Sequence, residues 1–223
     1  MPKPTFHNLP ADKRDRLVEL AIEEFAAHPY RQASLSRIVA RAGIAKGSVY
    51  QYFDNKLDLY TWLLTDELPR RKMAAIAAAP AGDSLWDVLR AAFLAGCAFA
   101  REQPQLARLG GRFRGESGDP ELAPIVAAHN AASHGWMRAQ LEHGQTTGDV
   151  LPGLDLDVAA TLLVTTLGEG MLPVFARRIG TTVDAWMADP SLADSLSDDD
   201  LAALVDAALG LLRGGFAPPP ESP

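Results

Sequence analysis

The stretch SLSRIVARAGIAKGSVYQYFDNKLDLY, residues 34–60, decides the fold of this protein. In its first third, apolar residues recur at the i, i+3, i+4, i+7 spacing of one amphipathic helix, which begins near Ser34. Gly43 supplies the left-handed residue that ends this helix. A second short helix is predicted over roughly 45–52, and the sequence FDNK breaks it. Two short helices joined by the tight connection AGIA predict a helix-turn-helix.

The second helix of this pair has two different sides. On a helical wheel with 100° per residue, Val49 and Phe53 share the side that is predicted to pack on the preceding helices. The opposite side carries glycine, serine and glutamine, flanked by two tyrosines, and no carboxylate. Such a surface suits phosphates and base edges. The predicted DNA-binding residues are Ser34, Ser36, Arg37, Lys46, Gly47, Ser48, Tyr50, Gln51, Tyr52 and Lys56.

Each of these residue types has a physical reason to meet DNA. Lys46 stands at a helix N-terminus, where the dipole favours an anion, and Gly47 allows the backbone to approach closely. The Gln51 amide suits adenine. The tyrosines offer a hydroxyl to phosphate, and Lys56 and the Ser34–Arg37 segment reach the DNA backbone. Taken one at a time, the tyrosines could equally be half-buried helix residues and Lys46 a solvated charge.

At this point the sequence resembles the DNA-binding motif of the TetR family of bacterial regulators. That motif has a second helix, an Ala-Gly turn, a Lys-Gly-x-x-Tyr-x-Tyr/His-Phe recognition helix and a Lys-x-x-Leu fourth helix. The amphipathic segment RDRLVELAIEEFA, residues 14–26, is similar to the family's first helix, so the resemblance covers roughly residues 11–62. One position departs from it, because Ala45 stands where many members place a serine cap.

The rest of the chain predicts more helices. Strand-type alternation is almost absent, so the expected fold class is all-α. Helix one is expected to begin after Pro10 and to run to about Ala27. Helix four is expected to follow a cap at Asp54 or Asn55 and to be kinked or interrupted at Pro69. Further helices are expected at about 84–101, 104–110, 120–146, 155–178 and 198–213, with loops at 114–120 and 189–197. The predicted domains are a helix-turn-helix DNA-binding domain over 1–53, a helical ligand-sensing and dimerisation domain over 54–214, and a disordered tail over 215–223.

Composition narrows the class of protein. The 223 residues carry a formal net charge of −7, but residues 1–72 hold 12 Lys and Arg against 9 Asp and Glu, and the remainder holds 9 against 19. This uneven charge suggests that only the first third meets a polyanion. The single cysteine, Cys97, is the normal pattern of a reducing cytoplasm. The most apolar window, residues 158–175, is interrupted by Glu169 and Pro173, which favours a buried helix and no membrane partner.

The resemblance also implies roles for the helices of the predicted domain over 54–214. The last two long helices would form a four-helix interface in a homodimer, with Leu162, Leu163, Leu201, Val205 and Leu211 among the residues of their apolar faces. The other helices would enclose a pocket for a small-molecule effector. The candidate ligand-binding residues are Trp86, Phe93, Cys97, His129, Ser133, Trp136, Met137, Gln140, Thr161, Thr165 and Glu169. Glu169 could instead belong to the interface, and each of the others could be an ordinary core residue.

The leading hypothesis is a ligand-responsive repressor that binds an inverted-repeat, double-stranded DNA operator as a homodimer. An alternative is a DNA-binding dimer whose C-terminal domain docks a protein partner or only dimerises. An enzyme is disfavoured, because His129 and His134 miss the one-face spacing of helical metal ligands, and phosphate-loop and nucleophile motifs are missing from the sequence. No catalytic residue, metal or cofactor is predicted.

Overall fold

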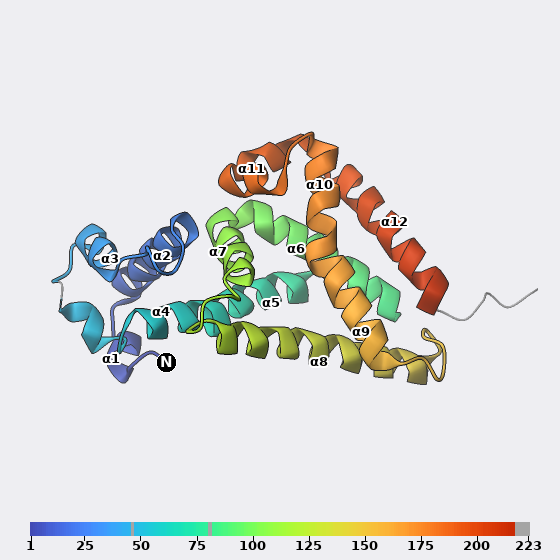
Figure 1. The fold of residues 1–223 in the computed structure, drawn as a ribbon, viewed down its shortest axis with the longest axis horizontal. Coiled ribbons are helices and arrows are strands. Elements are labelled where there is room, and N and C mark those ends of the chain that lie inside the picture. The colour runs from blue at the N-terminus through green and yellow to red at the C-terminus, as the bar shows by residue number, and fades with distance from the viewer. Residues whose placement is uncertain (46, 80–81, 217–223) are drawn as a thin grey trace, which may run out of the picture. The chain divides into compact units, whose positions relative to one another are not determined.

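The protein is built from helices (Figure 1). The structure, a computed structural model, describes residues 1–45, 47–79 and 82–216 of the 223. Within those ranges it contains no strand, which confirms the predicted all-α fold. The predicted disordered tail overlaps residues 217–223, which lie outside the described residues.

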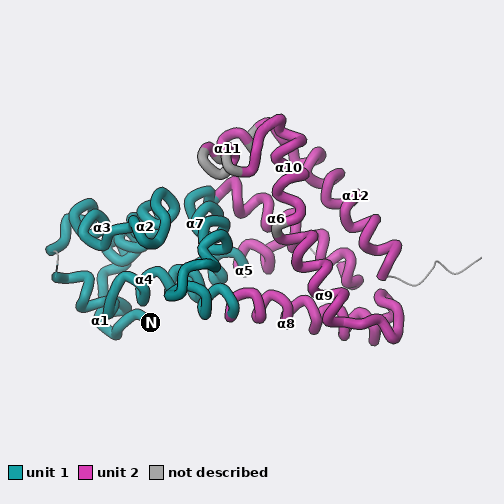
Figure 2. Tube along the Cα trace, viewed as in Figure 1, with its two compact units in different colours: residues 1–73, 103–127 teal, residues 74–102, 128–223 magenta. Residues whose placement is uncertain are grey.

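The chain divides into two compact units (Figure 2). The N-terminal unit comprises Met1–Met73 and Gln103–Ala127, and the C-terminal unit comprises Ala74–Glu102 and Ala128–Pro223. The functional division into domains at residue 53 stays a prediction.

The helices of the N-terminal unit include the helix-turn-helix. They are α1 (Pro4–His7), α2 (Ala11–Ala27), α3 (Leu35–Ala42), the 3₁₀ turn η1 (Ser48–Gln51), α4 (Lys56–Trp62), the π-helical turn η2 (Leu63–Glu67), α5 (Leu68–Ala78), which continues into the other unit, and α7 (Pro104–Gly115). The remaining elements are α6 (Leu85–Glu102), α8 (Ala123–Thr147), α9 (Leu156–Thr165), the π-helical turn η3 (Thr166–Gly170), α10 (Met171–Ile179), α11 (Val183–Ala188), the 3₁₀ helix η4 (Pro190–Ser195) and α12 (Asp198–Phe216).

The predicted stops and starts of the helix-turn-helix are confirmed. Gly43 adopts φ +68°, in the left-handed region, and the Ile44 N–H donates to the Val39 carbonyl at 3.1 Å, which closes α3. Asn55 caps α4, because its side chain accepts a hydrogen bond from the Asp58 N–H at 2.9 Å. The end of α3 at Gly43 and the start of α4 after Asn55 lie on either side of the segment that is predicted to contact DNA.

The interruption expected at Pro69 takes the form of a π-helical turn. The Leu68 N–H donates to the Leu63 carbonyl, five residues back, instead of four. Proline lacks an N–H and its ring collides with the carbonyl four residues earlier, so a widened turn ahead of Pro69 relieves both problems without ending the helix.

Two segments expected as loops are partly helical. The segment 114–120 begins inside α7, which runs to Gly115, and 189–197 contains η4. Periodicity is a weak signal over elements this short.

A single apolar cluster forms the core of the C-terminal unit. It unites α6, α8, α9, α10 and α12, and Leu89, Leu141 and Leu163 lie among its most buried members. Leu163, Leu201 and Val205 were predicted on a dimer face, and the structure instead buries them in this core. By length and composition alone, the helical run Leu156–Ile179 could cross a bilayer, yet in the fold it supplies core residues.

A glycine exchange tests the left-handed turn. We expect Gly43→Ala to lower the free energy of unfolding by about 1 kcal/mol, because an added Cβ meets no atom within 4 Å and only the positive φ is costly. Gly47→Ala is the matched control, since its site is equally open and its φ is −77°. Urea denaturation measures both variants, and an equal effect of the two would contradict the prediction.

Candidate nucleic-acid interface

The 3₁₀ turn η1 and the residues beside it present the surface expected to read DNA. Tyr50 is 51% exposed, and Gly47 and Gln51 are also exposed. Val49 and Phe53 are each 1% exposed, which confirms their predicted packing side. Apolar residues therefore anchor the turn, and its polar and aromatic side chains face solvent.

The second helix of the motif is shorter than predicted. An α-helix was expected over 45–52, and the structure shows a 3₁₀ helix over Ser48–Gln51. Its first residues receive no capping bond from a side chain, and the Ser48 N–H donates to the Ala45 carbonyl at 2.8 Å. Without a capping side chain at residue 45, and with a glycine and a β-branched valine in the turn, a full α-helical turn gains too little to form. Lys46 lies outside the described residues.

The N-terminal arm, residues 1–9, holds the C-terminal end of η1. The Lys3 backbone N–H donates to the Tyr52 carbonyl at 2.8 Å, and the Lys3 ammonium donates to the Tyr50 carbonyl at 2.9 Å. The Thr5 hydroxyl donates to the Gln51 carbonyl. These bonds satisfy carbonyls that every helix end leaves without a partner. The sequence interpretation missed this contact.

The arm is anchored by the short helix α1, which was also not predicted. Its Phe6 is 1% exposed, and the Phe6 ring centroid lies 5.1 Å from those of Phe53 and Trp62. A single phenylalanine in a four-residue helix gives no periodic pattern. The one available signal was Pro4 at the first helical position.

Arg37 and Ser34, both predicted to contact phosphate, are bound to α2 by one buried carboxylate. Glu24 is 4% exposed, and it accepts hydrogen bonds from the Ser34 N–H and the Arg37 Nε, each at 2.9 Å. Burial raises the pKa of Glu24, but the hydrogen bonds from Arg37 and Ser34 outweigh it, so the pKa lies below its usual value. The Arg37 guanidinium, half of which stays exposed, also donates to the Gln32 carbonyl at 2.8 Å.

Lys56 binds protein carbonyls. Its ammonium donates to the Tyr30 carbonyl at 2.6 Å and to the Ala33 carbonyl at 3.1 Å, and it lies 4.4 Å from the Tyr30 ring centroid. Burial, and secondarily the Arg31 charge, lower the pKa of Lys56. We assign it to holding the α2–α3 loop. Of the remaining predicted residues, Ser36 is exposed, and Ser48 and Tyr52 are half-buried.

The predicted ligand-binding residues do not share one surface. Trp86 and Met137 are buried in the C-terminal core, and the Trp86 Nε1–H donates to the Asp149 carbonyl at 3.2 Å. Trp136 is 41% exposed, and Thr161 and Thr165 are exposed as well. The remaining described members, Phe93, Cys97, His129, Ser133 and Gln140, are half-buried, and the Glu169 side chain lies outside the described residues.

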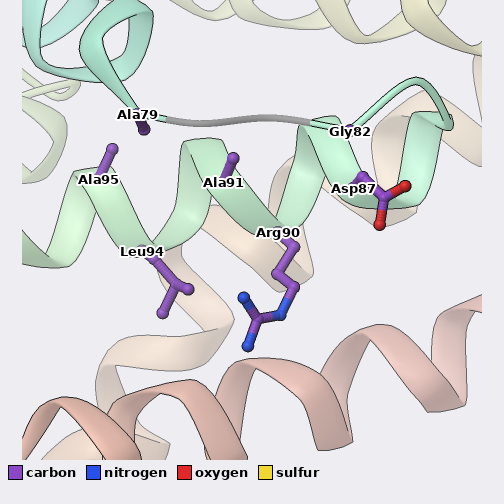
Figure 3. A pocket seen from close by; sticks show the side chains of 7 residues that line it. All are labelled: Ala79, Gly82, Asp87, Arg90, Ala91, Leu94 and Ala95. Atoms are coloured by element: carbon purple, nitrogen blue, oxygen red, sulfur yellow. The ribbon is translucent and has the colours of Figure 1, made fainter.

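A cavity of about 230 Å³ lies beside α6 and involves none of the predicted residues (Figure 3). Its charged lining groups are Asp87 and Arg90, and the Arg90 Nε donates to the Asp206 carboxylate at 2.6 Å. Figure 3 shows Arg90 and Leu94 pointing to one side of α6, and Ala91 and Ala95 to the other. Because Arg90 is already paired, this cavity offers little to hold a ligand.

The model of the family described as "Bacterial regulatory proteins, tetR family" matches residues 17–61, from within α2 to within α4. Residues 17–61 of the chain therefore match the TetR family.

Similarity beyond the TetR motif extends to most of the chain. The probable acrEF/envCD operon repressor of Escherichia coli strain K12 is 28% identical over 155 residues, which are 67% of this chain and 70% of that protein. A TetR family transcriptional regulator from Chloroflexus aurantiacus superposes with a TM-score of 0.71 at 27% identity and covers 98% of this chain and 100% of its own. Three further TetR-like relatives are matched over only 22% to 28% of their own length.

A third similarity concerns the fold alone. The transcriptional regulator FadR of Bacillus subtilis, in complex with stearoyl-CoA, superposes with a TM-score of 0.68 at 22% identity and covers 90% of this chain and 98% of its own.

The Glu24 carboxylate predicts a specific acid dependence of stability. Because the folded pKa of Glu24 is lowered, its contribution is present above the unfolded value of about 4.3 and is lost as the pH falls through the folded pKa. We expect Glu24→Gln to be less stable by about 2 kcal/mol at neutral pH, with the difference shrinking in acid. Urea titrations from neutral pH into acid measure this.

Glu23→Gln is the neighbouring control for this measurement. Glu23 pairs with Arg41 at the surface, where an ion pair contributes little. A difference between wild type and Glu24→Gln that does not change with pH would contradict the assigned role of the ion pair.

Proposed function

We propose that this protein is a transcriptional regulator that binds double-stranded operator DNA through the η1 surface. One observation carries the proposal. Within the segment matched by the TetR family, Val49 and Phe53 are buried while Tyr50 and Gln51 are exposed. A surface with hydroxyl and amide groups and no carboxylate suits phosphates and base edges. The direct contacts proposed are Ser36, Lys46, Gly47, Ser48, Tyr50, Gln51 and Tyr52, with Ser34 and the exposed part of Arg37 beside them.

The operator is proposed to be an inverted repeat read by a homodimer. One helix-turn-helix makes few base contacts, and a two-fold dimer places two of them on successive turns of DNA. Large apolar side chains stand exposed on α9 and α12, where a pairing surface was expected: Val158 is 57% exposed, Leu162 51% and Leu211 84%. The exposure of these side chains favours a pairing surface on α9 and α12.

The C-terminal unit is proposed to bind a small-molecule effector that releases the DNA. The FadR structure contains stearoyl-CoA, and the Escherichia coli relative is named a repressor, so a repressor with an elongated apolar effector is the favoured form. The partly polar side of α8, with His129, Ser133 and Gln140, is the proposed lining. The protein is proposed to work in the cytoplasm, where its DNA is.

A second candidate function omits the effector. Trp86 and Met137, predicted to line a pocket, are instead buried in the apolar core of the C-terminal unit. A filled core favours a C-terminal unit that only dimerises or docks a protein partner. Thermal stabilisation by a panel of acyl-CoA thioesters would favour the effector, and a second protein bound without any such shift would favour this alternative.

Selection of bound duplexes from a random pool tests the DNA-binding proposal. We expect a two-fold symmetric site to be enriched, and we expect Tyr50→Ala to weaken binding to it by about 1–3 kcal/mol. Lys46→Ala is expected to weaken binding to all sequences alike. It should also reduce, by about 1, the slope of the logarithm of the binding constant against the logarithm of the salt concentration. Trp136→Ala, at an exposed aromatic of the other unit, is the control. No enrichment even at low salt would contradict the proposal.

Charge placed on the exposed apolar face tests the dimer. We expect Leu162→Glu and Leu211→Glu to shift the protein to monomers in sedimentation velocity, because like charges would meet across a two-fold axis. Operator affinity should fall in parallel. Gln105→Glu adds the same charge at an exposed position of α7 and should leave the dimer intact. A dimer that persists in both leucine variants would place the interface elsewhere.

A further inference from the structure

The loop between α7 and α8 holds the loop that precedes α3. Glu116 follows α7 directly, and its two carboxylate oxygens accept one hydrogen bond each. The Tyr30 backbone N–H donates to Oε1 at 2.7 Å, and the Tyr60 hydroxyl donates to Oε2 at 2.8 Å. Tyr30 is 4% exposed and Tyr60 is fully buried, while Glu116 is half-buried, so both bonds are partly shielded from water.

A second carboxylate of the same loop binds the next residue of the α2–α3 loop. Arg31 donates to both oxygens of Asp119, at 2.6 and 2.8 Å, in a bidentate pair. Hydrogen bonding from Arg31 holds the pKa of Asp119 below its usual value. A bidentate pair fixes direction as well as distance. Two consecutive residues of the α2–α3 loop, Tyr30 and Arg31, are therefore each bound by a carboxylate of the α7–α8 loop.

Both the backbone N–H and the backbone carbonyl of Tyr30 form hydrogen bonds with charged side chains. Glu116 accepts from its N–H, and the Lys56 ammonium donates to its carbonyl at 2.6 Å. Lys56 also binds the Ala33 carbonyl at 3.1 Å, immediately before Ser34, the N-cap residue of α3. The loop that leads into α3 is thus bound by a carboxylate from outside the helix-turn-helix segment, in addition to Glu24, which binds the Ser34 N–H.

We propose that Glu116 is a positioning residue that fixes the α2–α3 loop, and through it the start of α3, in the arrangement that binds DNA. The proposal rests on the proposed function. It adds a connection between the DNA-reading helices and the rest of the chain that does not run along α4. Asp119 supports the same loop, and α8 starts four residues later, at Ala123, and continues to Thr147. A displacement of α8 would therefore reach α3 through these two carboxylates.

Two variants of Glu116 test this role. Glu116→Ala removes both acceptors, and we expect affinity for the selected operator duplex to fall about tenfold, because a smaller fraction of molecules holds the binding-competent loop. Glu116→Gln keeps a carbonyl for the Tyr30 N–H but replaces the acceptor of the Tyr60 hydroxyl by an amide donor, so it should restore part of the affinity. Glu102→Gln removes one carboxylate from an exposed position at the end of α6 and should bind as wild type.

Two further readouts separate positioning from loss of folded protein. Stoichiometric titration of the duplex gives the active fraction, which should stay at the wild-type value in Glu116→Ala. Hydrogen–deuterium exchange without DNA should show faster exchange over residues 30–38 in Glu116→Ala and protection partly restored in Glu116→Gln.

The outcomes are distinct. Unchanged affinity and unchanged exchange in Glu116→Ala would overturn the positioning role, as would a fall in active fraction that accounts for the whole loss. If wild-type protein binds no duplex, the proposed function fails, while the exchange result still decides whether Glu116 holds the loop.

Discussion

The N-terminal unit is organised around the buried side chain of Tyr60. Its ring centroid lies 4.7 Å from that of Phe25 in α2 and 5.1 Å from that of Tyr30 in the α2–α3 loop. Burial, and next the hydrogen bond to Glu116, raise the pKa of Tyr60, so its hydroxyl is a donor at any physiological pH. A phenol that is fully buried needs an acceptor, or it costs about 1–3 kcal/mol. The α7–α8 loop must therefore approach α4, and the same carboxylate then also binds Tyr30.

The turn η1, which is proposed to contact DNA, depends on its surroundings for its order. A four-residue 3₁₀ helix has few internal hydrogen bonds and poor bond geometry. Its order comes from elsewhere: Val49 and Phe53 anchor one side, and Lys3 and Thr5 bind the carbonyls at its end. Because other segments position η1, its exposed side chains remain free to bind a ligand. A small displacement of those segments would also move η1.

The sequence predicted the end of α3 and the start of α4 correctly because the signals for both are local, although the second helix of the motif is shorter than predicted. The left-handed glycine at Gly43, the cap at Asn55 and the apolar spacing of α3 act within a few residues. The arm and the α7–α8 loop could not be predicted in this way, since their bonds join residues 46 to 88 positions apart. Several candidate ligand-binding residues, Trp136 and Met137 among them, lie near one another on the helical wheel of α8. Spacing does not say which neighbour covers that side, which explains why Met137 is buried and Trp136 is exposed.

The positively charged side chains of the motif also have contacts that sequence spacing does not predict. Arg37 and Lys56 were predicted to meet phosphates, and both bind internal acceptors in the folded chain. A lysine whose ammonium donates to two carbonyls would have to give up those bonds to reach DNA. Fewer cations then remain to neutralise phosphates. Each neutralised phosphate contributes about 0.9 to the slope with which the logarithm of the binding constant falls against the logarithm of the salt concentration. If the protein binds DNA as proposed, the pairing of Arg37 and Lys56 predicts weak binding to non-specific DNA, and the uncharged surface around Tyr50 and Gln51 would then carry more of the discrimination between sites.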